Sequence, residues 1–291
     1  MDEVNQEKFM YQSCSTCVVG HLETGAAMLR IREVGFRYID LFAFTGTKHL
    51  CPTRLASGDT SQSEILEAAL AAHSLKISSF NCGLSVPVNL PDATVKAQFE
   101  REFLALLRLA ERWDCPVLTV QTGGAASESD FTDSWRRSAE GLGHLRELMG
   151  NSPVKLTFEP HFGGVAERLE DALALAERLW PEVGVTYDPS HFEMQIRGMD
   201  LRDTAVLFQF TLHVHVRNAI IGEMQVSMTE GTVDFSWLVP ALFKQGYRGA
   251  VAIEYLNSAE GEAQICRERL ALLGILDEPQ GTSAPIRYNL V

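Results

Sequence analysis

A short apolar run ends in an acidic residue at Val183-Gly184-Val185-Thr186-Tyr187-Asp188. Three further runs have the same form, with a β-branched or aliphatic core and a polar residue near the end: 154–159, 212–216 and 250–254. Between them lie segments whose apolar residues are three and four positions apart, as on one face of a helix. Short buried strands that alternate with amphipathic helices are typical of βα units and a parallel sheet.

The same alternation extends back toward the N-terminus. We expect strands to end at eight positions: Thr16, Asp40, Asn81, Gln121, Glu159, Asp188, His215 and Glu254. Eight parallel strands close a barrel of about 250 residues, and the chain of 291 residues fits one such domain. The sequence therefore predicts an α/β fold, a single-domain (β/α)₈ TIM barrel over residues 1–276, with a C-terminal tail at 277–291.

Two similar segments support repeated βα units. Residues 33–40 read Glu-Val-Gly-Phe-Arg-Tyr-Ile-Asp, and residues 244–249 read Lys-Gln-Gly-Tyr-Arg-Gly ahead of a strand that ends at Glu254. Gly35 and Gly246 each follow a helical segment, where a left-handed C-cap favours a residue without Cβ. Each segment predicts a helix end, a glycine cap and a strand leading to an acid.

Charge and composition narrow the class of protein. The formal net charge of -13 opposes binding to phosphate backbones and anionic lipid heads, so we expect neither a nucleic-acid nor a membrane partner. The six cysteines have irregular spacing, which argues against a disulfide framework. Neither a signal peptide nor an apolar run of about 20 residues is visible. We expect a cytoplasmic protein, and either a monomer or a homo-oligomer remains open.

Four predicted strand ends carry residues that bind metals: Glu159, Asp188, His215 and Glu254. In a closed barrel the C-terminal ends of the strands converge on one axis. Three carboxylates in a small volume repel one another unless a cation neutralises them. Singly, each residue is more often a helix cap, a surface acid or a core histidine, but the set predicts a site for one divalent ion. Oxygen and nitrogen donors favour Mn²⁺, with Mg²⁺, Co²⁺ or Zn²⁺ as alternatives.

The motifs around these residues resemble those of the xylose isomerase-like barrels, a group of sugar and sugar-phosphate isomerases and epimerases. The resemblance runs from about residue 14 to 276 and is carried by four motifs: Glu159-Pro160-His161, Asp188-Pro189-Ser190-His191, His215-Val216-Arg217-Asn218 and Ile253-Glu254. A glycine–acid turn at 231–235 also matches. The resemblance implies that Glu159, Asp188, His215 and Glu254 hold one divalent metal and that His191 touches the substrate.

A bound metal polarises a substrate carbonyl and favours removal of the proton α to it, through an enediolate. Glu159 and Glu254 are the candidates to remove and return that proton, and His191 completes the predicted catalytic set. For contacts to substrate hydroxyls we expect Arg217, Gln121, Asn81 and His161. The predicted function is a metal-dependent isomerase or epimerase of a small carbohydrate, which is a sugar, a sugar phosphate or a keto-cyclitol.

Other readings remain open. Loss of a β-hydroxyl from the same intermediate would make the protein a dehydratase or lyase of a keto-cyclitol or keto-sugar. The 3-epimerases of the group carry an arginine a few residues past the strand-seven histidine, whereas this chain reads Ala-Ile-Ile-Gly-Glu at 219–223. An endonuclease IV-like enzyme is disfavoured because strand three ends at Phe80-Asn81-Cys82, without a histidine ligand. A non-catalytic sugar-binding barrel is the remaining alternative.

Overall fold

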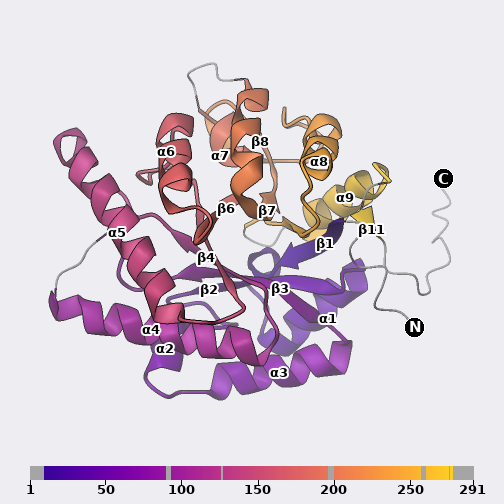
Figure 1. The fold of residues 1–291 in the computed structure, drawn as a ribbon. Helices are drawn as coiled ribbons and strands as arrows, with labels where there is room; N and C mark the ends of the chain where they lie inside the picture. The colour runs from indigo at the N-terminus through magenta and orange to yellow at the C-terminus, as the bar shows by residue number, and fades with distance from the viewer. Residues whose placement is uncertain are drawn as a thin grey trace, which may run out of the picture.

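Eight parallel strands close into a barrel in the computed structural model of the chain (Figure 1). The structure describes residues 10–89, 93–125, 127–195, 200–256, 260–274 and 276–277. Pairing of the last barrel strand with the first closes the ring. The predicted single (β/α)₈ barrel is therefore confirmed. Its strands are β1 (Met10–Ser15), β2 (Tyr38–Phe44), β3 (Lys76–Gly83), β4 (Val117–Gln121), β5 (Lys155–Glu159), β6 (Val183–Tyr187), β7 (Thr211–Val216) and β10 (Ala250–Ile253).

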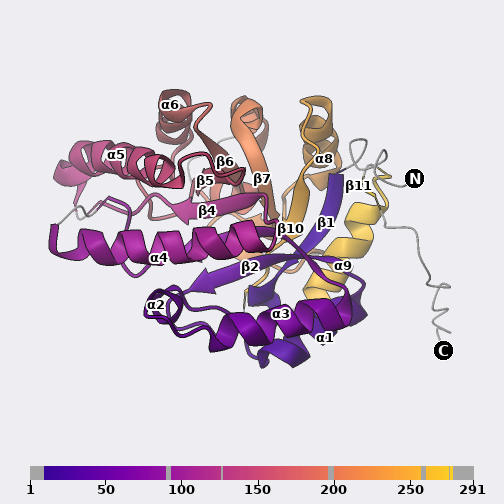
Figure 2. The same ribbon diagram turned by 60° about the horizontal axis from the view of Figure 1, so that its bottom comes forward.

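Helices surround the barrel, as the two views in Figures 1 and 2 show. The segment between β6 and β7 also contains the 3₁₀ helix η4 (Leu201–Phe210). No helix in the described part of the chain is long and apolar enough to cross a membrane. The α-helices are α1 (Thr24–Val34), α2 (Pro52–Ala56), α3 (Ser61–His73), α4 (Ala93–Arg112), α5 (Phe131–Met149), α6 (Leu169–Leu179), α7 (Pro189–Glu193), α8 (Phe235–Lys244) and α9 (Glu260–Ala271).

Two short elements lie beside the barrel. An antiparallel hairpin of β8 (Asn218–Ile220) and β9 (Glu223–Val226) follows β7. Residues Leu276–Asp277 form β11, which pairs with the start of β1. Apart from Asp277, the predicted tail at 277–291 lies outside the described residues, as do positions 1–9 of the predicted domain.

The strands are short and buried on both faces because helices cover the outside of the barrel and side chains fill its inside. All five residues of β6 are buried. Within β6, Gly184 allows close packing, since a Cβ there would lie 2.5 Å from a side-chain carbon of Leu212. Gly35 ends α1 in the left-handed conformation with φ 105°, as the sequence predicted.

The barrel interior below its C-terminal rim is polar. Side chains on a strand alternate between faces, so the residue two positions before each rim residue points the same way. On five of the strands this residue is polar: Ser79, Thr119, Thr157, Thr186 and His213. The hydroxyls of Thr119, Thr157 and Thr186 bond to one another at 2.7–3.0 Å. This hydroxyl layer replaces the branched aliphatic residues that usually fill such barrels.

Candidate active site

The four predicted metal ligands come together at the C-terminal rim. Glu159 ends β5, Asp188 directly follows β6, His215 lies in β7, and Glu254 directly follows β10. One ligand atom from each lies within 4.8 Å of the others, and all four side chains are buried. Their assignment as metal ligands stays a prediction. It requires the four donor groups to lie close together, and they do.

His215 is the centre of the set. Its Nδ1 lies 2.8 Å from Oε1 of Glu159 and 3.4 Å from Oε2 of Glu254. Burial alone would lower the pKa of the imidazole, but the carboxylates of Glu254, Asp40 and Glu159 raise it well above its ordinary value. In the metal-free protein the surrounding carboxylates therefore favour the protonated form of the ring.

The two glutamates have opposite pKa shifts. Burial would raise the pKa of Glu159, but the charge and hydrogen bond of His215 outweigh it and lower that pKa to about 2. Burial raises the pKa of Glu254 to about 7, against the opposing charges of His215 and Arg217. Asn81 also holds Glu254, since its Nδ2 donates to Oε1 at 2.8 Å. These shifts describe the site without a cation, and a bound divalent ion would favour the ionised form of both glutamates.

Arg217 lies inside the ligand set and is only 2% exposed. Its Nη2 is 2.9 Å from Oδ2 of Asp188, and its Nη1 is 3.4 Å from Oε2 of Glu254. The Nε atom donates to the hydroxyl of Ser190 at 2.9 Å. The sequence proposed Arg217 for substrate binding; the structure places its guanidinium against two of the predicted ligands.

His191 is completely buried beside this arginine. Its Nε2 lies 3.1 Å from Nη2 of Arg217, and its Nδ1 lies 3.3 Å from the amide nitrogen of Phe162. Burial lowers the pKa of His191 well below its ordinary value, and the neighbouring charges of His161 and Arg217 lower it further. Burial therefore favours the neutral ring, whose centroid lies 4.1 Å from that of His161 with the two ring planes tilted by 46°.

A cavity of about 340 Å³ opens next to the ligand set. It is lined by Gln121, His161 and Phe162, by apolar side chains between β3 and α4, and by glycines 123, 124, 163 and 164. Gln121 is the strand neighbour of Glu159, and His161 follows Glu159 by two residues. Of the four residues expected to contact substrate, Gln121 and His161 line this cavity, whereas Arg217 and Asn81 contact the predicted ligands.

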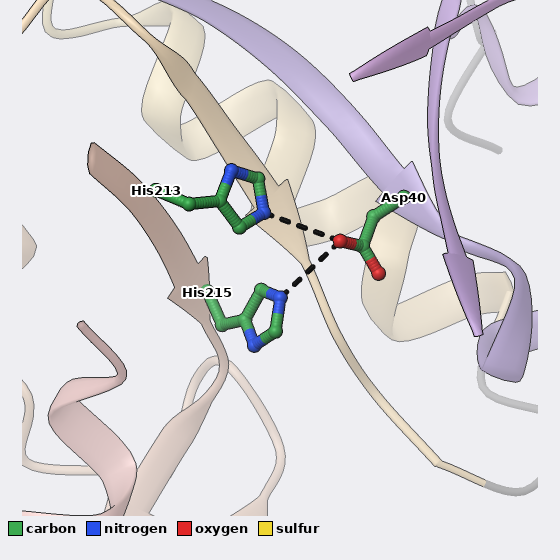
Figure 3. A group of neighbouring side chains, drawn as sticks. All are labelled: Asp40, His213 and His215. Carbon is green, nitrogen blue, oxygen red and sulfur yellow. Dashed lines mark hydrogen bonds and ion pairs between the residues drawn. The ribbon is translucent and has the colours of Figure 1, made fainter. Parts of the chain in front are cut away.

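Asp40, which is not among the predicted site residues, lies beside the ligand set and contacts His215. One oxygen of Asp40, Oδ2, lies 3.2 Å from Nε2 of His213 and 3.3 Å from Nε2 of His215 (Figure 3). Burial would raise the pKa of Asp40, but the two imidazoles hold it below its usual range. The similarity of the segments at 33–40 and 244–254 pointed to Asp40, because one segment ends at Asp40 and the other at the predicted ligand Glu254, and both acids are buried.

The stretch in which the sequence lacks the arginine of the 3-epimerases belongs to the β8–β9 hairpin. Residues 219–223, where the 3-epimerases place an arginine, form the tip of the β8–β9 hairpin, with Gly222 at φ 84°. Ile221 at this tip is 62% exposed. The buried guanidinium next to the ligands comes instead from Arg217, two residues after His215.

A divalent cation fits this donor set. The three carboxylates carry three negative charges, and the guanidinium of Arg217 compensates one of them. One divalent ion would balance the remaining two once the Nδ1 proton of His215 has left. The donors are oxygens and one imidazole nitrogen, which suit Mn²⁺, Mg²⁺, Co²⁺ or Zn²⁺.

The chain belongs to the family described as Xylose isomerase-like TIM barrel, which it matches over residues 28–274. This confirms the resemblance seen in the sequence. The chain is 27% identical over 144 residues to the inosose dehydratase of Bacillus licheniformis. That match covers 43% of this chain and 48% of the relative, so it spans about half the length of the curated protein.

Solved structures with the same fold include enzymes that act on sugars. The 3-keto-D-glucoside 4-epimerase of E. coli is 17% identical with a TM-score of 0.71, over 91% of this chain and 99% of that one. A xylose isomerase-like TIM barrel protein from Mycobacterium smegmatis, in complex with magnesium, is 16% identical with a TM-score of 0.70. This second match covers 92% of this chain and 97% of the other. At these identities the likeness establishes the fold alone.

Proposed function

We propose that the protein is a divalent-metal-dependent isomerase or epimerase of a small carbohydrate, acting by removal of the proton α to a carbonyl. The observation that carries the proposal is the convergence of Glu159, Asp188, His215 and Glu254 within 4.8 Å, beside a cavity that opens at the rim. A bound divalent ion would polarise the substrate carbonyl and stabilise the negative charge that develops when the proton leaves.

Glu159 and Glu254 exchange the substrate proton in this proposal. They lie on β5 and just after β10, which are separated in the barrel by β6 and β7, so they can reach a substrate from two sides. With the ion bound both groups are carboxylates, and one of them takes the α-proton and so becomes the carboxylic acid from which the proton is given back. Return to the opposite face of the same carbon gives an epimer, and return to the neighbouring carbon gives an isomer.

The remaining residues bind and orient the substrate. Neutral His191 can hydrogen-bond a substrate oxygen without adding charge to the site, while Arg217 stabilises the negative charge of the enediolate. Gln121 and His161 line the cavity and can bind the distal hydroxyls. Among the residues that the structure describes, the cavity lining includes no lysine or arginine, which favours an uncharged sugar or cyclitol over a phosphorylated one.

Dehydration is a second candidate, and one observation favours it: the matched curated relative is an inosose dehydratase. Both reactions begin with loss of the same α-proton. They differ in the next step, since a dehydratase expels the β-hydroxide as water after a proton reaches it, whereas an epimerase returns the proton to carbon.

A panel of ketoses and keto-cyclitols in D₂O, followed by NMR with the Mg²⁺-loaded protein, tests the proposal. An isomerase or epimerase incorporates one deuterium at the α-carbon or its neighbour and retains every hydroxyl. A substrate that loses a hydroxyl identifies a dehydratase. Glu254→Gln removes a proposed proton-exchange group that is also a predicted ligand, so both metal binding and deuterium incorporation should be lost. Exchange at the wild-type rate in this variant would contradict the assigned roles.

A further inference from the structure

We infer that Asp40 is a positioning residue, which orients the imidazole of His215 so that its Nδ1 faces the metal. The inference rests on the metal site of the proposed function and assigns a role to a side chain outside the ligand set. Asp40 is completely buried in β2, on the far side of His215 from the predicted ligands.

The two nitrogens of His215 face different partners. Nδ1 points to Glu159 and Glu254, and Nε2 points to Oδ2 of Asp40 at 3.3 Å. When Nε2 donates its hydrogen to Asp40, the neutral ring carries its lone pair on Nδ1, which is the form that can bind a cation. A carboxylate that accepts from the second nitrogen of a ligand histidine also makes the ring a stronger ligand.

Asp40 is itself held rigidly by neighbours in the polar layer. The hydroxyl of Ser79 donates to the same oxygen, and Nε2 of His213 lies 3.2 Å away. His213 and His215 are on the same face of β7, and both rings point toward Asp40 (Figure 3). Since a charge-assisted hydrogen bond of this kind depends on geometry, the whole group fixes one orientation of the His215 ring.

Another reading of the same cluster is a second cation site. Asp40, His213 and His215 have ligand atoms within 4.8 Å of one another. Oδ2 already contacts both imidazoles and Ser79 directly, without an ion between them, whereas the other oxygen of Asp40, Oδ1, is buried and has no hydrogen-bond partner. The positioning role therefore predicts one bound ion per chain, whereas a second site predicts two.

Binding of Mn²⁺, followed by the EPR signal of the free ion, tests the inference in three variants. Asp40→Val fits a strand but accepts no hydrogen bond, and we expect its Kd to rise about 10–100-fold. Asp40→Asn retains an acceptor oxygen and should show a smaller rise of about tenfold. Thr119→Val is the matched control, because it removes a buried hydroxyl from the same layer and contacts no predicted ligand.

A second readout follows the ring directly, by ¹⁵N NMR of histidine-labelled protein loaded with Zn²⁺. In the wild type, His215 should show a protonated Nε2 and a metal-bound Nδ1, and Asp40→Val should lose this single pattern. If Asp40→Val does not fold, Asp40→Asn carries the test alone. Asp40 variants with the Kd of Thr119→Val overturn the inference, as do two ions in the wild type with only one lost in the variants.

The result also separates this inference from the proposed function. One ion bound through Nδ1, with weaker binding in the Asp40 variants but no deuterium exchange on any substrate, would leave the positioning role standing and reject the proposed reaction. A wild type that binds no ion would overturn both.

Discussion

The guanidinium of Arg217 forms a buried ion pair with Asp188, with 2.9 Å between Nη2 and Oδ2. The same side chain reaches Glu254 at 3.4 Å, so one arginine joins two carboxylates from β6 and β10. A buried carboxylate without a counter-charge is costly, and the arginine makes this cluster tolerable when no cation is bound. Arg217 therefore affects both the stability of the folded barrel and the charge of the predicted metal site.

Replacement of this arginine should destabilise the metal-free protein. For Arg217→Met we expect the free energy of unfolding to fall by about 3–5 kcal/mol, because the carboxylates lose their buried counter-charge. Added Mn²⁺ should restore part of the loss by binding the folded state. Urea unfolding with and without the ion measures both effects. Arg217→Lys is the control, and a loss as large as that of Arg217→Met would show that the charge is not what stabilises the site.

The contact between Asn81 and Glu254 gives a second prediction. Asn81→Ala removes a hydrogen bond to a buried carboxylate, which contributes about 1.5–3 kcal/mol. We expect the affinity for Mn²⁺ to fall by roughly tenfold to a hundredfold, since Glu254 loses the group that orients it. Titration calorimetry measures this. Cys82→Ala, at the next position of β3, is the control, and equal affinities in the two variants would reject a role for Asn81.

The pH dependence of metal binding has a definite sign. The ion and protons compete for Glu254, whose pKa is raised to about 7, and for Nδ1 of His215, whose pKa is raised well above its ordinary value. Both groups hold their protons at low pH, so the affinity for the ion should rise with pH. We expect the Kd for Mn²⁺ to fall by about tenfold or more between pH 5.5 and pH 8. A Kd that is constant over this range would contradict the assignment of Glu254 and His215 as ligands.

Gln121 should affect the substrate and leave the metal unchanged. Its side chain lines the cavity next to Glu159, but it is not among the predicted ligands. For Gln121→Ala we expect KM to rise about tenfold on the substrate that the D₂O panel identifies, with kcat nearly constant. Metal content should equal that of the wild type. A loss of bound metal, or a fall in kcat alone, would place Gln121 in a different role.

The sequence predicted the barrel and its ligand set because both depend on local patterns. The strands β5, β6, β7 and β10 are short apolar runs, and each ends near a polar residue of the site. Parallel strands bring their ends to one rim, so four separated residues could be expected in one place. Gly35 and Gly246 have positive φ, which is the left-handed conformation that commonly follows the end of an α-helix.

Other features depend on contacts across the barrel and gave only weak signals. The sequence suggested that the second strand ends at Asp40, but β2 continues to Phe44, so Asp40 lies below the rim. Its partners His213 and His215 are more than 170 positions away, and no local pattern predicts that contact. The β8–β9 hairpin is too short for a strand pattern to be visible, and η4 has a helical period that does not distinguish 3₁₀ from α-helix.

The central claim is that Glu159, Asp188, His215 and Glu254 hold one divalent ion, and metal content measures it most directly. Wild-type protein and Glu159→Gln should be incubated with Mn²⁺, freed of unbound ion and analysed by plasma mass spectrometry. We predict about one ion per chain in the wild type and almost none in the variant. No bound metal in the wild type, or equal amounts in the two proteins, would contradict the site and the proposed reaction that depends on it.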